Sequence, residues 1–143
     1  MASKASVGAQ ISLDGEKSYK QAIKDIVAQL KSLQAEQKKI AAQFEQTNNA
    51  QRYNTQSAQN LSDQIQVQQK YIAELTNHYQ KQVDQLGIFN SETLKAKASV
   101  EKAEAALADL NKQLVNVNAL DQVTQKEKLL ASELDKVKAK FEL

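Results

Sequence analysis

Apolar side chains recur along this chain in alternating steps of four and three residues, the spacing of a coiled-coil seam. With Ile23 taken as position a, one unbroken register runs from Tyr19 to Val117. No a or d position in that span is charged, although 25% of the chain is Asp, Glu, Lys or Arg. The pattern predicts an all-α protein of long helices with coiled-coil heptads, in an extended or helical-hairpin arrangement.

The large apolar members of this seam are the residues expected to form the interface of a homo-oligomer. Each lies at an a or d position, where a side chain packs into the facing helix. They are Ile23, Ile26, Leu30, Leu33, Ile40, Phe44, Leu61, Ile65, Ile72, Leu75, Leu107, Leu110 and Leu114.

After Val117 the seam shifts by one residue and continues to the end of the chain. Such a shift predicts a local change in supercoil. Because Lys136 to Leu143 still follow the seam, we expect the chain to be a fragment of a longer protein. The shifted positions are Leu120, Val123, Glu127, Leu130, Leu134, Val137 and Phe141.

Residues 46–69 are rich in Gln and Asn, and the seam there is thin and polar. One interpretation is a turn at Asn48 and Asn49 between antiparallel helices. The other is a continuous helix with a polar layer that specifies register at a cost in stability. The unbroken heptad phase favours continuity, so the sequence predicts one helix over residues 16–86, with a possible turn or weak seam at 46–60.

A second interruption follows Leu86, where the capping signals are stronger. Gly87 is the residue type that ends helices, and Asn90 or Ser91 caps a helix start. Glu92 would lie in the first turn, where a negative charge is favourable. The sequence therefore predicts a break here and a second coiled-coil helix over residues 91–143.

The amino terminus has a different periodicity. Val7, Ala9, Ile11 and Leu13 alternate with small or polar residues, and Asp14-Gly15 is a turn signal. Residues 1–15 are therefore predicted to form a short β-strand and a turn ahead of the first long helix. A lone strand needs a partner strand to satisfy its edges.

Composition leaves little material for catalysis. The chain has no Cys and a single His, His78, so Cys-containing zinc sites and disulfides are impossible, and an acid–base mechanism based on His would depend on that residue. Glu74 lies one helical turn before His78, which favours a solvated surface pair. We expect a non-enzyme with no catalytic residues, no metal ligands and no cofactor.

The charge and hydropathy of the chain limit the classes of partner that it is expected to bind. The net charge is +2, with basic and acidic residues evenly distributed along the chain. Nucleic-acid binding needs concentrated positive charge, so no nucleic-acid partner is expected. No apolar run is long enough to cross a bilayer, and the start lacks the apolar core of a secretory signal. No stable membrane association is therefore expected.

The opening segment, Val7 to Ile26, resembles the start of phage tail tape measure proteins. So does the stretch Leu30 to Glu36 that follows. The stretch Thr93 to Leu114, with Ala103 to Leu114 within it, resembles the second amino-terminal helix of that family. The resemblance implies the amino-terminal portion of a viral structural protein that acts in virion assembly and tail-length determination. Homo-oligomeric copies, three or six of them, would form a rod inside the tail tube.

The same resemblance implies partners and a location. The partners would be the tail tube protein and the tail assembly chaperones, and the place would be the lumen of the virion tail after assembly in the host cytoplasm. The alternative is a soluble helical hairpin or bundle that binds partner helices. Residues 46–60 distinguish the two, because they must turn in a hairpin and can stay helical in a rod.

Overall fold

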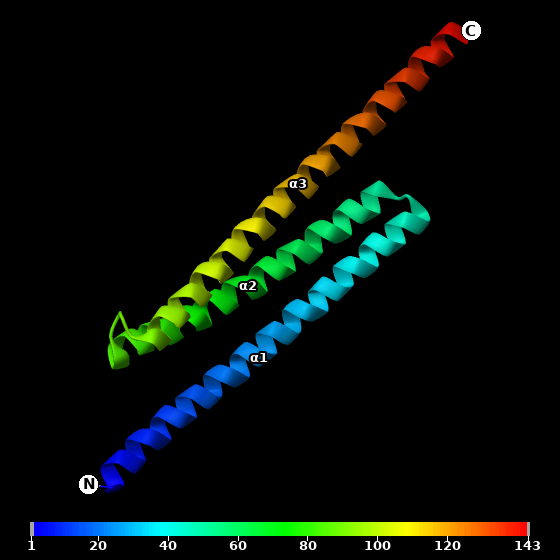
Figure 1. Ribbon diagram of the computed structural model, residues 1–143. Coiled ribbons are helices and arrows are strands. Elements are labelled where there is room, and N and C mark those ends of the chain that lie inside the picture. Colours follow the sequence, from blue (N-terminus) through cyan, green and yellow to red (C-terminus); the bar gives the residue numbers. More distant parts are fainter. Residues whose placement is uncertain (1, 143) are drawn as a thin grey trace.

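The computed structural model describes the backbone of residues 2–142 and the side chains of residues 15–123 and 125–140. Three helices make up this part of the chain: α1 (Ala2–Thr47), α2 (Ala50–Leu86) and α3 (Ser91–Glu142) (Figure 1). No strand occurs within residues 2–142. The predicted all-α class is therefore confirmed.

The three helices run alternately up and down, with α2 in the middle (Figure 1). Gln37 on α1 donates a hydrogen bond to Ser57 on α2, and Gln68 on α2 donates to the Ala103 carbonyl on α3. Across residues 2–142, α1 and α3 share no packing contacts. The molecule is thus two antiparallel hairpins that share α2, rather than a closed three-helix bundle.

The strand expected over residues 6–14 is absent, since this segment belongs to α1. A lone strand would leave both edges without hydrogen-bond partners, whereas a helix satisfies its backbone groups within the segment. The alternation of four apolar residues does not outweigh this advantage of the helix in backbone hydrogen bonding.

The chain turns at Asn48 and Asn49, so the single helix expected over residues 16–86 is wrong and the turn alternative holds. Asn48 has φ 52°, a left-handed conformation that Asn tolerates better than most residues. Asn49 then caps α2, because its side-chain oxygen accepts a hydrogen bond from the Arg52 amide at 3.1 Å. These local preferences of two Asn residues end α1 although the heptad phase continues.

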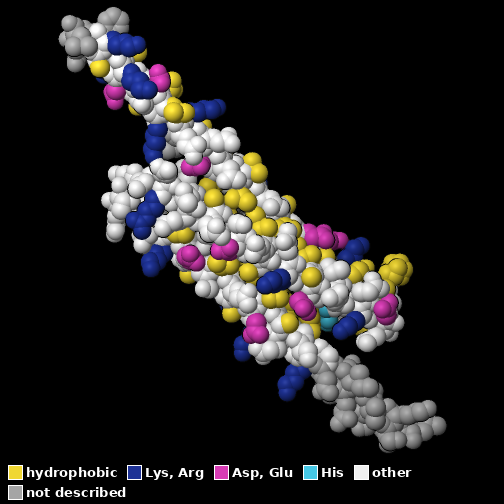
Figure 2. Space-filling model, turned by 180° about the vertical axis from the view of Figure 1, so that it is seen from behind, with side chains coloured by type: hydrophobic (Ala, Val, Ile, Leu, Met, Phe, Trp, Pro, Cys, Tyr) yellow, Lys and Arg dark blue, Asp and Glu magenta, His cyan; other side chains and the backbone are white. Residues whose placement is uncertain are grey.

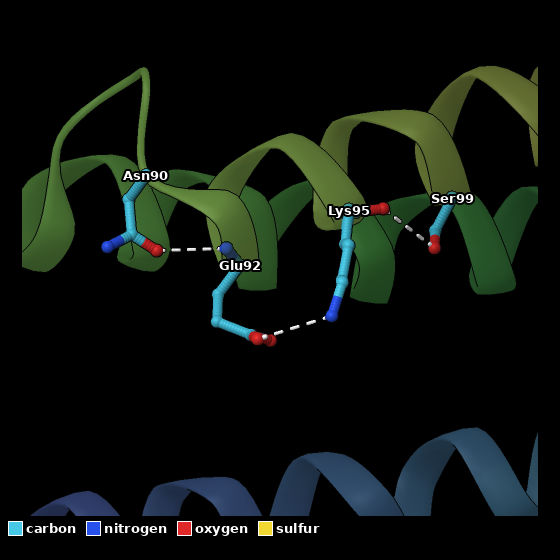
Figure 3. A network of polar contacts seen from close by, with 4 residues as sticks. All are labelled: Asn90, Glu92, Lys95 and Ser99. Atoms are coloured by element: carbon cyan, nitrogen blue, oxygen red, sulfur yellow. Dashed lines mark hydrogen bonds and ion pairs between the residues drawn. The ribbon is translucent and has the colours of Figure 1, made fainter.

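The second break lies where Gly87 and Asn90 predict it. Gly87 adopts φ 84°, and its amide donates to the Val83 carbonyl at 2.9 Å. Figure 3 shows the start of α3, where the Asn90 side chain accepts a hydrogen bond from the Glu92 amide at 2.9 Å. Glu92 pairs with Lys95 at 3.5 Å, and Ser99 donates back to the Lys95 carbonyl at 3.1 Å. Asn90 therefore caps the start of α3, and an ion pair stabilises its first turn.

The core lies along the two lines where helices meet. On α1 the buried apolar residues are Ile26 and Ile40, and on α3 they are Ala96 and Ala103. All four are seam positions, and α2 is the helix that packs on both α1 and α3. Phe89 is also a seam position by sequence, but it lies in the connector and is 89% exposed. The seam is thus used for packing within one chain.

Candidate functional site

The residues predicted to form an oligomer interface all lie on packed faces of this single chain. Four are buried and the other nine are half-buried. Those of α1 lie on a helix that packs on α2, and those of α3 lie on the other helix that packs on α2. The buried ones are Ile26, Ile40, Leu61 and Leu75; the half-buried ones are Ile23, Leu30, Leu33, Phe44, Ile65, Ile72, Leu107, Leu110 and Leu114.

As the central helix, α2 presents two different stripes to its neighbours. The predicted seam of α2 faces α3, as the bonds from Gln68 to the Ala103 carbonyl and from Thr93 to the Gln82 carbonyl show. The stripe that faces α1 occupies the c and g heptad positions, which the apolar periodicity does not mark. Its described members include Tyr53, Ser57, Asn60, Gln64, Val67, Tyr71 and His78.

This second stripe is polar at its centre. Ser57 and Asn60 are fully buried, and Gln64 is 5% exposed. Asn60 donates from Nδ2 to the Leu33 carbonyl at 2.9 Å, and its Oδ1 accepts from Gln64 at 2.6 Å. The α1–α2 interface is therefore held partly by directional hydrogen bonds, each of which contributes little net free energy.

Two buried amide oxygens, Gln37 Oε1 and Gln82 Oε1, have no hydrogen-bond partner among the described atoms. An unsatisfied buried acceptor costs about 1–3 kcal/mol. Gln37 lies in the α1–α2 interface and Gln82 in the α2–α3 interface. Each interface therefore buries a polar atom that has no described hydrogen-bond partner. The packing is weaker than that of a fully apolar interface.

The carboxyl-terminal half of α3 is an exposed apolar face. Lys128 donates a hydrogen bond to Gln51 near the start of α2, so the residues that follow project past the hairpins (Figure 1). Exposure is 50% for Val123, 70% for Leu130, 54% for Leu134 and 46% for Val137. We call these four residues, together with Glu127 between them, the α3 stripe.

The α3 stripe is exposed because of the one-residue shift after Val117. The face of α3 that packs on α2 continues from Leu114 through Val117 to Asp121, which are all half-buried. A shift by one residue turns the apolar face by about 100° around the helix. The stripe therefore points away from α2 where the helices overlap, and α2 no longer covers α3 beyond Lys128. Phe141 continues the pattern, but its side chain lies outside the described residues.

His78 lies on α2 against α1, not on a free surface. Its ring stacks on Tyr19 with centroids 4.0 Å apart and an interplanar angle of 5°. Glu16, Tyr19, Glu74, His78 and Lys81 line an open hollow of about 740 Å³. The hollow is wide and open on one side.

Burial against α1 lowers the pKa of His78 below its usual value, with Lys81 adding to the shift and Glu16 opposing it. Burial also raises the pKa of Tyr19, to which the negative charge on Glu74 and the neighbouring Tyr71 contribute. Both shifts favour the neutral rings that are stacked here.

The lowered pKa of His78 makes the fold less stable in acid. The folded chain binds fewer protons than the unfolded chain, so stability is full above the unfolded pKa of about 6.5 and falls as the pH falls through it. Because His78 is the only His, its ring proton resonances identify it. We expect an NMR titration to give a lower midpoint in the folded chain than in 8 M urea. An equal or higher folded midpoint would contradict the packing described here.

Two further kinds of feature are absent from the described part of the chain. No group of three or more His, Asp or Glu side chains there could hold a metal ion. None of its helices has a stretch long and apolar enough to cross a membrane.

Comparisons with known proteins identify no relative of this chain. No family model, no curated protein and no solved structure matches the chain.

Proposed function

We propose that this chain is a non-enzymatic helical assembly protein that acts by packing against other helices. The observation that carries the proposal is the α3 stripe, an exposed heptad face of four apolar residues and Glu127 that points away from α2 and continues past the hairpins. An exposed apolar face of this length is typical of a protein–protein contact. The proposal assigns recognition to helix packing rather than to a pocket.

Within this class, the geometry best supports a helical hairpin module that binds a partner helix. The turn at Asn48 and Asn49 is the feature that a hairpin requires and a continuous rod does not. In this form α1 and α2 support α3, and the free end of α3 makes the contact.

A phage tail tape measure protein is the second candidate, and two observations favour it. The strand-turn-helix pattern of the opening sequence and the helical stretches after it resemble that family. The a/d register also continues without a break through Asn48 and Asn49, so opened helices would share one seam. In this role, opened copies would form a rod in the tail lumen, with tail tube protein around them. A fully helical chain of this length would span about 215 Å.

A distance measurement distinguishes the hairpin module from the rod. The chain has no Cys, so Lys31→Cys with Thr76→Cys, both at exposed positions, provides two unique label sites. The hairpin predicts about 20–25 Å between the labels, and a continuous helix predicts about 67 Å. Double electron–electron resonance measures both ranges.

A second label pair within α2 is the matched control. Gln59→Cys with Thr76→Cys, also exposed, should give about 26 Å in either form, because one helix carries both labels. A distance near 67 Å for the first pair, with the control unchanged, would overturn the hairpin module and favour the rod.

A further inference from the structure

The free end of α3 has the heptad pattern of a short two-stranded coiled coil. In the shifted register Glu127 and Leu134 are a positions, while Val123, Leu130 and Val137 are d positions. Figure 2 shows hydrophobic side chains along this end between Lys, Arg, Asp and Glu side chains. The flanking g positions are Lys126 and Glu133, both exposed. These two charges and Glu127, with Lys138 and Lys140 farther along the helix, determine which pairings are favourable.

A parallel pair of identical helices is disfavoured by Glu127. Each a position would face its own copy, so two Glu127 carboxylates would oppose each other inside the contact. A Glu133 to Lys138 attraction on each side would offset only part of that repulsion, because those charges lie at the solvated edge. The two hairpin bodies would also have to lie side by side.

An antiparallel pair centred between Lys128 and Leu129 removes the conflict. In that register a positions face d positions, so Glu127 lies opposite Leu130 of the second copy. Val123 lies opposite Leu134, and the two g positions place Lys126 opposite Glu133. Each of these pairings occurs twice, because the two-fold axis repeats it.

Neighbouring antiparallel registers lack this complementarity. A displacement by one heptad toward the carboxyl terminus places Lys126 opposite Lys140, and Glu133 opposite its own copy. A displacement toward the amino terminus places Lys126 opposite its own copy. Like charges facing each other at g positions weaken a pair, so charge favours the register centred between Lys128 and Leu129 over these two.

The shape of the molecule also fits this pairing. The hairpins lie at one end of α3 and the stripe lies near the other end (Figure 1). Antiparallel overlap of the two stripes therefore directs the hairpin bodies in opposite directions, away from each other. From register, charge and shape we propose that the α3 stripe binds a second copy of this chain as an antiparallel coiled coil. This inference rests on the proposed function, whose contact surface it uses.

Leu130→Glu and Leu129→Glu test the proposal as a matched pair. Leu130 is a d position that would face Glu127 of the second copy, whereas Leu129 is a c position outside the contact; both are exposed, at 70% and 66%. We expect sedimentation equilibrium to show wild type reaching twice the 15.9 kDa of one chain. Leu130→Glu should weaken the dimer at least about tenfold, and Leu129→Glu should leave it unchanged, with equal helicity by circular dichroism.

Charge reversal and one label test the orientation. Lys126→Glu should weaken the dimer, and adding Glu133→Lys should restore it, because only the antiparallel register pairs these two positions. An Ala139→Cys label should give about 35 Å between copies in the antiparallel pair, against less than about 20 Å in a parallel one.

Three results would overturn the inference. They are a monomer at every concentration, equal effects of the two Leu substitutions, and a short distance between the Ala139→Cys labels. If the chain is monomeric but the labels at positions 31 and 76 still give the hairpin distance, the stripe does not bind a second copy. The proposed function would then still stand.

Discussion

Replacing Leu61 by Ala is expected to lower the free energy of unfolding by about 3 kcal/mol. Leu61 is 3% exposed and lies at a d position of α2. Because α2 is packed on both sides, the shortened side chain leaves a cavity that neighbouring helices fill only in part. The substitution should therefore weaken the shared centre of both hairpins.

Leu129→Ala is the matched control for this prediction. The same atoms are removed, but Leu129 is 66% exposed on α3, so the change should stay within about 0.5 kcal/mol. Urea unfolding followed by circular dichroism at 222 nm measures both. Equal losses for the two variants would mean that Leu61 is not in a packed core.

The helical class and the packed faces of α1 and α3 were predictable from sequence. Steps of four and three residues show which side of a helix is apolar, and Ile26, Ile40 and Ala103 are buried as that pattern requires. The pattern does not show what covers the face. Packing between copies and packing within one chain use the same a and d positions, so only the turns distinguish them.

The face of α2 that packs on α1 could not be predicted from hydrophobic periodicity. Its centre consists of Ser57, Asn60 and Gln64, which count as surface residues in any hydropathy pattern. The off-seam aromatics Tyr53 and Tyr71 were the available signal, since Tyr53 packs against Phe44 with ring centroids 4.7 Å apart. Buried amides pair through hydrogen bonds that depend on the three-dimensional alignment of two helices.

The α3 stripe could likewise be predicted from the sequence only in part. Its residues and the one-residue shift after Val117 could be read directly from the sequence. Its exposure could not, because exposure depends on where α2 begins, and α2 begins at Ala50 only because the chain turns at Asn48 and Asn49. The sequence marked these two residues as a possible turn, but the continuous heptad phase favoured one unbroken helix, and this preference concealed the candidate contact surface.

The buried polar layer leads to the second large prediction, that Asn60→Asp lowers the free energy of unfolding by about 3–5 kcal/mol at neutral pH. The substitution preserves shape but removes the Nδ2 donor. Its carboxylate oxygen would then face the Leu33 carbonyl, which Nδ2 now contacts at 2.9 Å. Asn60 is 2% exposed and its hydrogen-bond partners, the Leu33 carbonyl and the Gln64 amide, are neutral, so the new charge would be buried among neutral groups.

Acid should reverse much of this loss. A buried carboxyl with no cationic partner has a raised pKa in the folded chain, so the folded variant binds more protons than the unfolded one. The deficit relative to wild type should therefore shrink as the pH falls from 7 toward 4, because the protonated carboxyl can donate to the Leu33 carbonyl as the amide did. Asn111→Asp, at an exposed position on α3, should stay within about 0.5 kcal/mol of wild type throughout. Urea unfolding at each pH measures the difference, and a deficit that is small or independent of pH would show that Asn60 does not lie in a closed α1–α2 interface.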